Sequence, residues 1–134
     1  MIKDYSGFVL VNILSHYSPN LTILNLKNTN VGVESMKAIR DYLSNSICKL
    51  EVINLSGNKL EDTSFCELCV GISQNFSLKA LDFRSNRITH VSMKIFNSII
   101  KYSRILQEVD LSHNALSNEG IEIISKNLGR NKSL

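Results

Sequence analysis

The chain has 134 residues, which is enough for one domain with a continuous apolar core. Hydrophobic residues make up 43% of the chain and charged residues 20%, and a single proline argues against a disordered or linker-rich protein. The net charge of +3 is small and no basic block concentrates it, so we expect neither a nucleic-acid partner nor a membrane surface.

Residues 1–20 precede the first repeated motif. Leu10 and Leu14 fit the buried positions of a helix, and we expect a short helix near 5–16. The apolar stretch 8–14 is too short for a transmembrane span, and the N-terminus lacks the cleavage site of a signal peptide. We therefore expect a cytoplasmic location, and we interpret residues 1–20 as a partial repeat that begins just after a strand.

A motif then recurs four times along the chain, at nearly constant spacing. Each copy follows the pattern L-x-x-L-x-L-x-x-N-x-L, with Ile, Val or Phe replacing some leucines. Inside each copy, apolar positions four and six alternate with polar ones, which predicts a half-buried strand. The copies are LTILNLKNTNV (21–31), LEVINLSGNKL (50–60), LKALDFRSNRI (78–88) and LQEVDLSHNAL (106–116).

The period changes to that of a helix after each motif. Apolar residues recur at i, i+3 and i+7, which predicts one buried face of an amphipathic helix. These stripes are Met36, Ile39 and Leu43; Phe65, Leu68 and Ile72; Met93, Phe96 and Ile100; and Ile121, Ile124 and Leu128. The helices are expected over 33–46, 62–75, 90–103 and 118–129.

One strand and one helix per repeat predict an α/β solenoid arc. All strands run in one sense, so they form a parallel sheet, and the helices form a second layer. Strands are about 4.8 Å apart and helices about 10 Å wide, so the array curves with the sheet on the concave face and the helices on the convex face.

The motif resembles the leucine-rich repeat family, in particular its ribonuclease-inhibitor-like class of long repeats. The resemblance covers the whole chain and implies a single domain over 1–134, with repeats at 21–49, 50–77, 78–105 and 106–133. Leu134 then opens a further repeat. We see no polar cap at either end, which leaves end-to-end self-association through uncapped repeat ends open.

Position nine of each motif is expected to form a structural ladder between repeats. An asparagine there both donates to and accepts from the backbone where the strand turns away. The first repeat has a threonine instead, whose hydroxyl replaces only part of that bonding, so we expect a looser first turn. The ladder residues are Thr29, Asn58, Asn86 and Asn114.

The outward face of the sheet is the candidate binding surface, because positions three, five and seven of each strand point away from the core. We expect an exposed apolar patch near the first strand and an acidic region near the last, partly offset by Arg84. The alternative is a solvated face with a local ion pair. The candidate partner-binding residues are Ile23, Asn25, Lys27, Val52, Asn54, Asp82, Arg84, Glu108 and Asp110, and Ser56 and Ser112 complete position seven.

No motif in the chain indicates catalysis, a metal or a cofactor. Gly-rich phosphate loops, paired-histidine helices and nucleophile elbows are missing from the sequence. Cys66 and Cys69 form a C-x-x-C within an expected helix, with Cys66 facing solvent and Cys69 at the edge of that exposed face, so we interpret them as inert thiols. We interpret the Asn-x-Ser/Thr sites as by-products of composition; they lie at Asn20, Asn54, Asn75 and Asn131.

The resemblance implies a non-enzymatic module that binds a protein partner through the concave face and its rims. Two alternatives stay open. The first is a GTPase-activating protein of the leucine-rich-repeat type, similar to the activator of the nuclear-transport GTPase, for which Arg84 and Arg87 are the basic candidates near the concave edge. The second is a structural segment of a longer repeat array, which contributes spacing rather than recognition.

Overall fold

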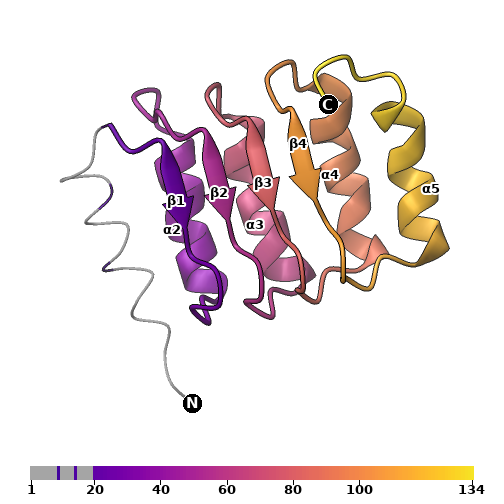
Figure 1. The fold of residues 1–134 in the computed structure, drawn as a ribbon, viewed down its shortest axis with the longest axis horizontal. Helices are drawn as coiled ribbons and strands as arrows, with labels where there is room; N and C mark the ends of the chain where they lie inside the picture. The colour runs from indigo at the N-terminus through magenta and orange to yellow at the C-terminus, as the bar shows by residue number, and fades with distance from the viewer. Residues whose placement is uncertain (1–8, 10–13, 15–19) are drawn as a thin grey trace.

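A computed structural model describes Val9, Leu14 and residues 20–134 of the chain. The expected helix near 5–16 lies outside the described residues, apart from Val9 and Leu14. The other elements alternate along the chain (Figure 1): β1 (Ile23–Asn25), α2 (Val33–Leu43), β2 (Val52–Asn54), α3 (Asp62–Ser73), β3 (Ala80–Asp82), α4 (His90–Tyr102), β4 (Glu108–Asp110) and α5 (Ser117–Leu128). The predicted helix ends lie close to these bounds.

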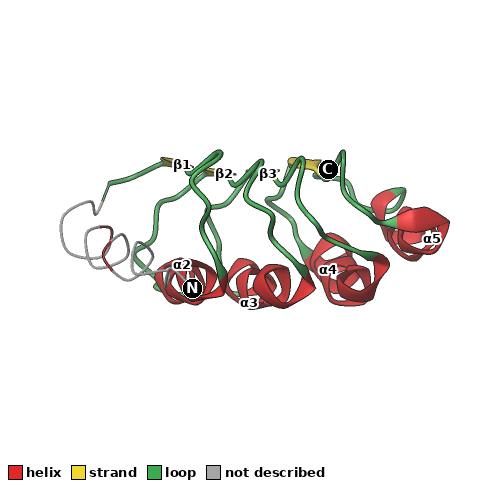
Figure 2. Cartoon of the chain, turned by 90° about the horizontal axis from the view of Figure 1, so that it is seen from below, coloured by secondary structure: helices red, strands yellow, loops and turns green. Residues whose placement is uncertain are grey.

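The four strands form one parallel sheet in the order β1-β2-β3-β4. Equivalent positions of the repeats are paired, so Ile23, Val52, Ala80 and Glu108 form one row across the sheet. The helices form a second layer that covers one face of the sheet and spreads more widely than the strands do (Figure 2). The predicted fold class, an α/β solenoid arc with parallel strands on the inner face, is confirmed.

The core lies between the two layers and runs through all four repeats. Positions four and six of the strands and the helix stripes supply it, as the two periods predict. Phe65 is at its centre, with its ring 5.0 Å from that of Phe83 in an edge-to-face arrangement and 5.4 Å from that of Phe96. Aromatic contacts as well as the sheet therefore join the second repeat to the third.

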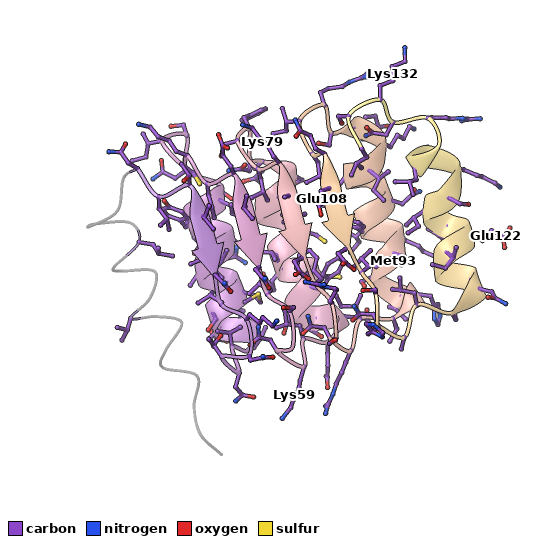
Figure 3. The ribbon with its side chains drawn as sticks, viewed as in Figure 1. Lys59, Lys79, Met93, Glu108, Glu122 and Lys132 are labelled. Carbon is purple, nitrogen blue, oxygen red and sulfur yellow. The ribbon has the colours of Figure 1, made fainter. Side chains whose placement is uncertain are left out.

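The predicted stripe of the last helix is wrong at two of its three positions. Ile124 is buried, but Ile121 and Leu128 are exposed on α5. In α2, α3 and α4 the equivalent side chains are covered by the repeat that follows, whereas α5 packs against α4 alone among the described elements. The side of α5 that faces away from α4 carries polar residues as well, and Glu122 projects from it (Figure 3).

The turn after each strand requires a left-handed backbone at position eight. Asn28, Gly57, Ser85 and His113 all have φ between 55° and 70°. Glycine adopts this conformation without steric cost, whereas the other three residues adopt it at a cost in conformational free energy. A Cβ at Gly57 would lie 1.9 Å from Oδ1 of Asn28, so the exposed side chain of Asn28 would have to rotate away.

Among residues 20–134 and the two described residues before them, no helix has the length and apolar character needed to cross a membrane.

Candidate functional site

The position-nine asparagines form a ladder beneath the carboxyl ends of the strands. The side-chain amide of Asn86 donates to the carbonyls of Leu55 and Phe83 at 3.0 and 2.9 Å, and its Oδ1 accepts from the N–H groups of Asn58 and Leu60 at 3.1 and 2.9 Å. This rung therefore joins two neighbouring repeats through four backbone groups.

The ladder becomes weaker at its two ends. Asn58 repeats the pattern by donating to Leu26 and Leu55, and its Oδ1 accepts from the N–H of Thr29. Asn114 is only half-buried. The hydroxyl of Thr29 donates to Leu26 at 2.7 Å and makes fewer backbone contacts than an asparagine does at the same position.

A second set of asparagines, which sequence reasoning missed, lies at the opposite edge where each helix turns into the next strand. Asn75 donates to the carbonyl of Leu43 at 3.0 Å, and its Oδ1 accepts from the N–H groups of Ser77 and Leu78. Asn131 caps Ser133 and Leu134 in the same way. The signal lies in the sequence, since NFSL and NKSL occupy the same register two repeats apart, but composition alone also explains an Asn-x-Ser pattern.

The structure brings the nine candidate binding residues together on the outer face of the sheet. Each lies at position three, five or seven of its motif, and the pairing places equivalent residues side by side. Ile23 is 60% exposed and lies beside the half-buried Val52. Ser56 is an exception to the predicted exposure of position seven: it is buried, and its hydroxyl donates to Oδ1 of Asn54 at 2.8 Å.

Acidic residues and one arginine gather at the other side of this face. Asp82 and Asp110 are paired on β3 and β4. Arg84 lies between them, with Nη2 2.7 Å from Oδ2 of Asp82 and Nε 3.3 Å from Oδ2 of Asp110. The hydrogen bond from Arg84 holds the pKa of Asp82 below its ordinary value, although partial burial opposes this. Glu108 is exposed on β4 and projects from the same face (Figure 3).

Every position-five side chain also supports its own strand. Asn25, Asn54, Asp82 and Asp110 each accept a hydrogen bond from the backbone N–H two residues later, at 2.9 to 3.1 Å. The second oxygen of each of the two carboxylates contacts Arg84. These four residues therefore hold the end of each strand and present a polar row at the same time.

The C-x-x-C motif differs from its prediction. Cys66 is partly exposed, but Cys69 is buried rather than at the edge of an exposed face, and burial raises the pKa of its thiol. The reason is that α4 covers this side of α3. Across the described part of the chain no three metal-ligating side chains cluster together, and Nε2 of His90 lies 3.6 Å from Oε2 of Glu119.

The chain is similar in sequence to named proteins over most of its length. It is 28% identical over 137 residues to a mouse protein named "NACHT, LRR and PYD domains-containing protein 14", covering 81% of this chain and 14% of that protein. It is 31% identical over 96 residues to bovine "NACHT, LRR and PYD domains-containing protein 3", covering 63% of this chain and 9% of that protein. The chain thus spans about a seventh or less of the length of these relatives.

Solved structures share the fold at low identity. A structure titled "Leiomodin-1 Actin-Binding Site 2 (ABS2)" matches with a TM-score of 0.79 at 17% identity, over 92% of this chain and 73% of the other. A tropomodulin C-terminal domain from Caenorhabditis elegans matches with a TM-score of 0.60 at 18% identity, over 92% of each chain.

Family models match the repeats directly. A model described as "Leucine Rich repeat" matches residues 17–39, 74–94 and 102–125, and a second with the same description matches residues 49–70. These segments contain the strands and the helix starts of all four motifs. The chain belongs to the leucine-rich repeat family.

Proposed function

We propose that this chain is a non-enzymatic recognition module that binds a protein partner through the outer face of its sheet. The proposal includes the ribonuclease-inhibitor-like class, with repeats at 21–49, 50–77, 78–105 and 106–133 and Leu134 opening another. It also includes a cytoplasmic setting, for which the three free cysteines Cys48, Cys66 and Cys69 are the support.

The observation that carries the proposal is the exposed apolar surface at Ile23 and Val52 on the same face as an ordered charged cluster. A β-branched apolar side chain that is 60% exposed on a sheet face gains little for folding. The arginine on this face is held by two aspartates, so the surface has a fixed charge pattern as well as an apolar anchor. The apolar side chains lie on β1 and β2 and the charged cluster on β3 and β4, and a surface that combines an apolar anchor with ordered polar groups is found in protein interfaces.

The test is a matched pair of variants of the whole chain. Ile23→Asp combined with Val52→Asp is expected to leave the circular dichroism spectrum unchanged, to lower the melting temperature because two carboxylates then lie side by side on paired strands, and to abolish affinity capture of the partner. Ile47→Asp is the control, because Ile47 is 61% exposed but lies outside the sheet. Capture that is unchanged in the double variant, or lost equally in the control, would remove the sheet face from consideration.

A GTPase-activating protein is the alternative from a different functional class. Such an activity needs a basic or polar side chain that is free to reach a nucleotide. Here Arg84 is engaged by two aspartates, and Arg87 lies 3.6 Å from Glu61. These ion pairs count against the alternative, and a GTP-hydrolysis assay with a panel of small GTPases tests it directly.

The second alternative is that the chain only provides spacing within a longer array. Substitution of Asp82 and Asp110 by asparagine without any change in partner binding would favour it. End-to-end self-association belongs to this alternative too, with the exposed Ile121 and Leu128 of α5 as its contact residues. Sedimentation velocity at increasing concentration tests it, and a monomer throughout would exclude it.

A further inference from the structure

A groove lies in the helical layer, on the side of the molecule away from the proposed binding face. It runs between α3 and α4 towards their carboxyl ends and has a volume of about 680 Å³. Its floor is formed by the buried side chains of Cys69, Ile72 and Ile99. None of the nine sheet-face residues lines it, so it is a separate surface.

One repeat position differs between α3 and α4. In α3 this position is Gly71, where a Cβ would lie only 2.7 Å from Cα of Arg40, so α3 packs directly on the backbone of α2. In α4 the equivalent residue of the next repeat is Ile99. Ile99 lines the groove, and α3 and α4 pack less closely than either neighbouring pair.

Exposed apolar side chains gather around this groove. Phe76 is 89% exposed and Tyr102 is 68% exposed, and Val70 and Ile95 are exposed beside them. Four of the ten large hydrophobic side chains that are exposed in the described part of the chain therefore line one groove. Scattered apolar residues on a surface are ordinary, but a gathered set of this kind marks an interaction site.

The charge of the groove is of one sign. Its charged lining residues are Lys94 and Arg104, and both are exposed. Within residues 20–134 neither of them forms an ion pair, although five other lysines and arginines do. An occupant that carries carboxylates next to its apolar side chains would satisfy both cations and cover the apolar surface.

The walls also limit the backbone conformation of the occupant. The long walls are the helices α3 and α4, whose backbone groups are bonded within each helix, and the rest of the lining, including Phe76 and Arg104, lies in the loops that follow them. No strand lines the groove, so it offers no strand edge with which an extended peptide could pair. A helix satisfies its own backbone and presents apolar residues at i, i+3 or i+4, and i+7. We propose that the α3–α4 groove is a second docking site, which takes an amphipathic helical segment of a partner protein with acidic residues flanking its apolar face.

The test uses a displayed library of helical peptides selected on the whole 134-residue chain. The library varies apolar residues along one face and varies Asp, Glu, Lys, Arg and Ser beside them. Enriched peptides are expected to carry an excess of Asp and Glu. One enriched peptide, synthesised with a fluorescent label, should bind the wild-type chain about tenfold more tightly than it binds the Phe76→Ser variant.

Charge reversal and a matched control complete the design. Lys94→Glu with Arg104→Glu should weaken the acidic peptide about fivefold and should favour a version of that peptide with lysines in place of its acidic residues. Ile23→Asp with Val52→Asp should leave binding unchanged, which separates this site from the sheet face. Phe76, Lys94 and Arg104 are exposed, so these variants retain the core.

Several results would overturn the proposal. They are the absence of any enriched peptide, enrichment without acidic bias, or equal binding to the Phe76→Ser variant. A concentration-dependent dimer that Phe76→Ser abolishes would instead assign the groove to a second copy of this chain. Saturable binding of palmitate that Phe76→Ser abolishes, with no peptide enriched, would assign it to a small apolar ligand.

Discussion

Replacing Asn86 by alanine tests whether the asparagine ladder holds the repeats together. The side chain is buried and contacts two carbonyls and two N–H groups at 2.9 to 3.1 Å. Truncation leaves the buried N–H groups of Asn58 and Leu60 without an acceptor, whereas the carbonyls of Leu55 and Phe83 still accept from the amides of Asn58 and Asn114. Each unsatisfied buried group costs about 1–3 kcal/mol, and a water molecule that enters the vacated space would recover part of that cost.

We therefore expect Asn86→Ala to lower the free energy of unfolding by about 3 kcal/mol, which is a large fraction of the total for a domain of this size. Asn86→Thr should recover about 1 kcal/mol of this loss, because the hydroxyl of Thr29 already donates to the carbonyl of Leu26 at the same position. Asn114→Ala should cost only about half as much as Asn86→Ala, because Asn114 is half-buried and water reaches its partners.

The assay is urea unfolding followed by far-ultraviolet circular dichroism, with the slope of the transition checked for constancy. Asn118→Ala serves as the control, since Asn118 is exposed on α5, and it should change the free energy by less than about 0.5 kcal/mol. A loss below about 1 kcal/mol for Asn86→Ala, or equal losses at Asn86 and Asn114, would refute the account of the ladder.

Two further predictions concern the turns and the helix starts. Gly57→Ala should lower the free energy of unfolding by about 1–2 kcal/mol, because φ is +70° and the exposed side chain of Asn28 must move to admit the Cβ. Ser85→Gly at the equivalent position should preserve or raise stability, and equal thermal shifts in the two variants would contradict this. Burial tends to raise the pKa of Asp62, but hydrogen bonds from Ser92 and Thr89 outweigh it, so the pKa lies below its ordinary value. The Asp62 carboxylate therefore stabilises the fold at pH values above its ordinary pKa, and this stability is lost as the pH falls through the lowered pKa of the folded state. Between neutral pH and about pH 2.5, the urea midpoint of Asp62→Asn should therefore fall less than the urea midpoint of the wild type.

Most of the fold was predictable because the repeat applies two independent periods to the same stretch of chain. Strand positions four and six and the helix stripes have different spacings, and both recur in every repeat. A single short strand would be a weak signal, but four in phase predict a parallel sheet. The ladder positions were predictable for a related reason, since an asparagine at a fixed place after every strand needs a backbone partner.

The errors come from properties that depend on neighbouring repeats rather than on the repeat itself. The exposure of Ile121 and Leu128 depends on whether another element covers α5. The burial of Cys69 depends on how α4 lies against α3, and an alignment of α3 with the other helices contains no information about that packing. The role of Asn75 was missed because its motif recurs fully only at Asn131, while the repeat between them has Ser103 there, whose hydroxyl accepts from the N–H of Leu106.

The same reasoning indicates where the specific function of this chain lies. Positions that are alike in every repeat, such as the inward strand leucines and the asparagine ladder, are explained by the scaffold. The residues that determine the specific function must lie at positions that the repeat leaves free to vary. Position three changes along the sheet from Ile23 and Val52 to Ala80 and Glu108, and position twenty-two changes from Gly71 to Ile99. The first change sets the character of the sheet face, and the second places a branched side chain in the floor of the groove between α3 and α4.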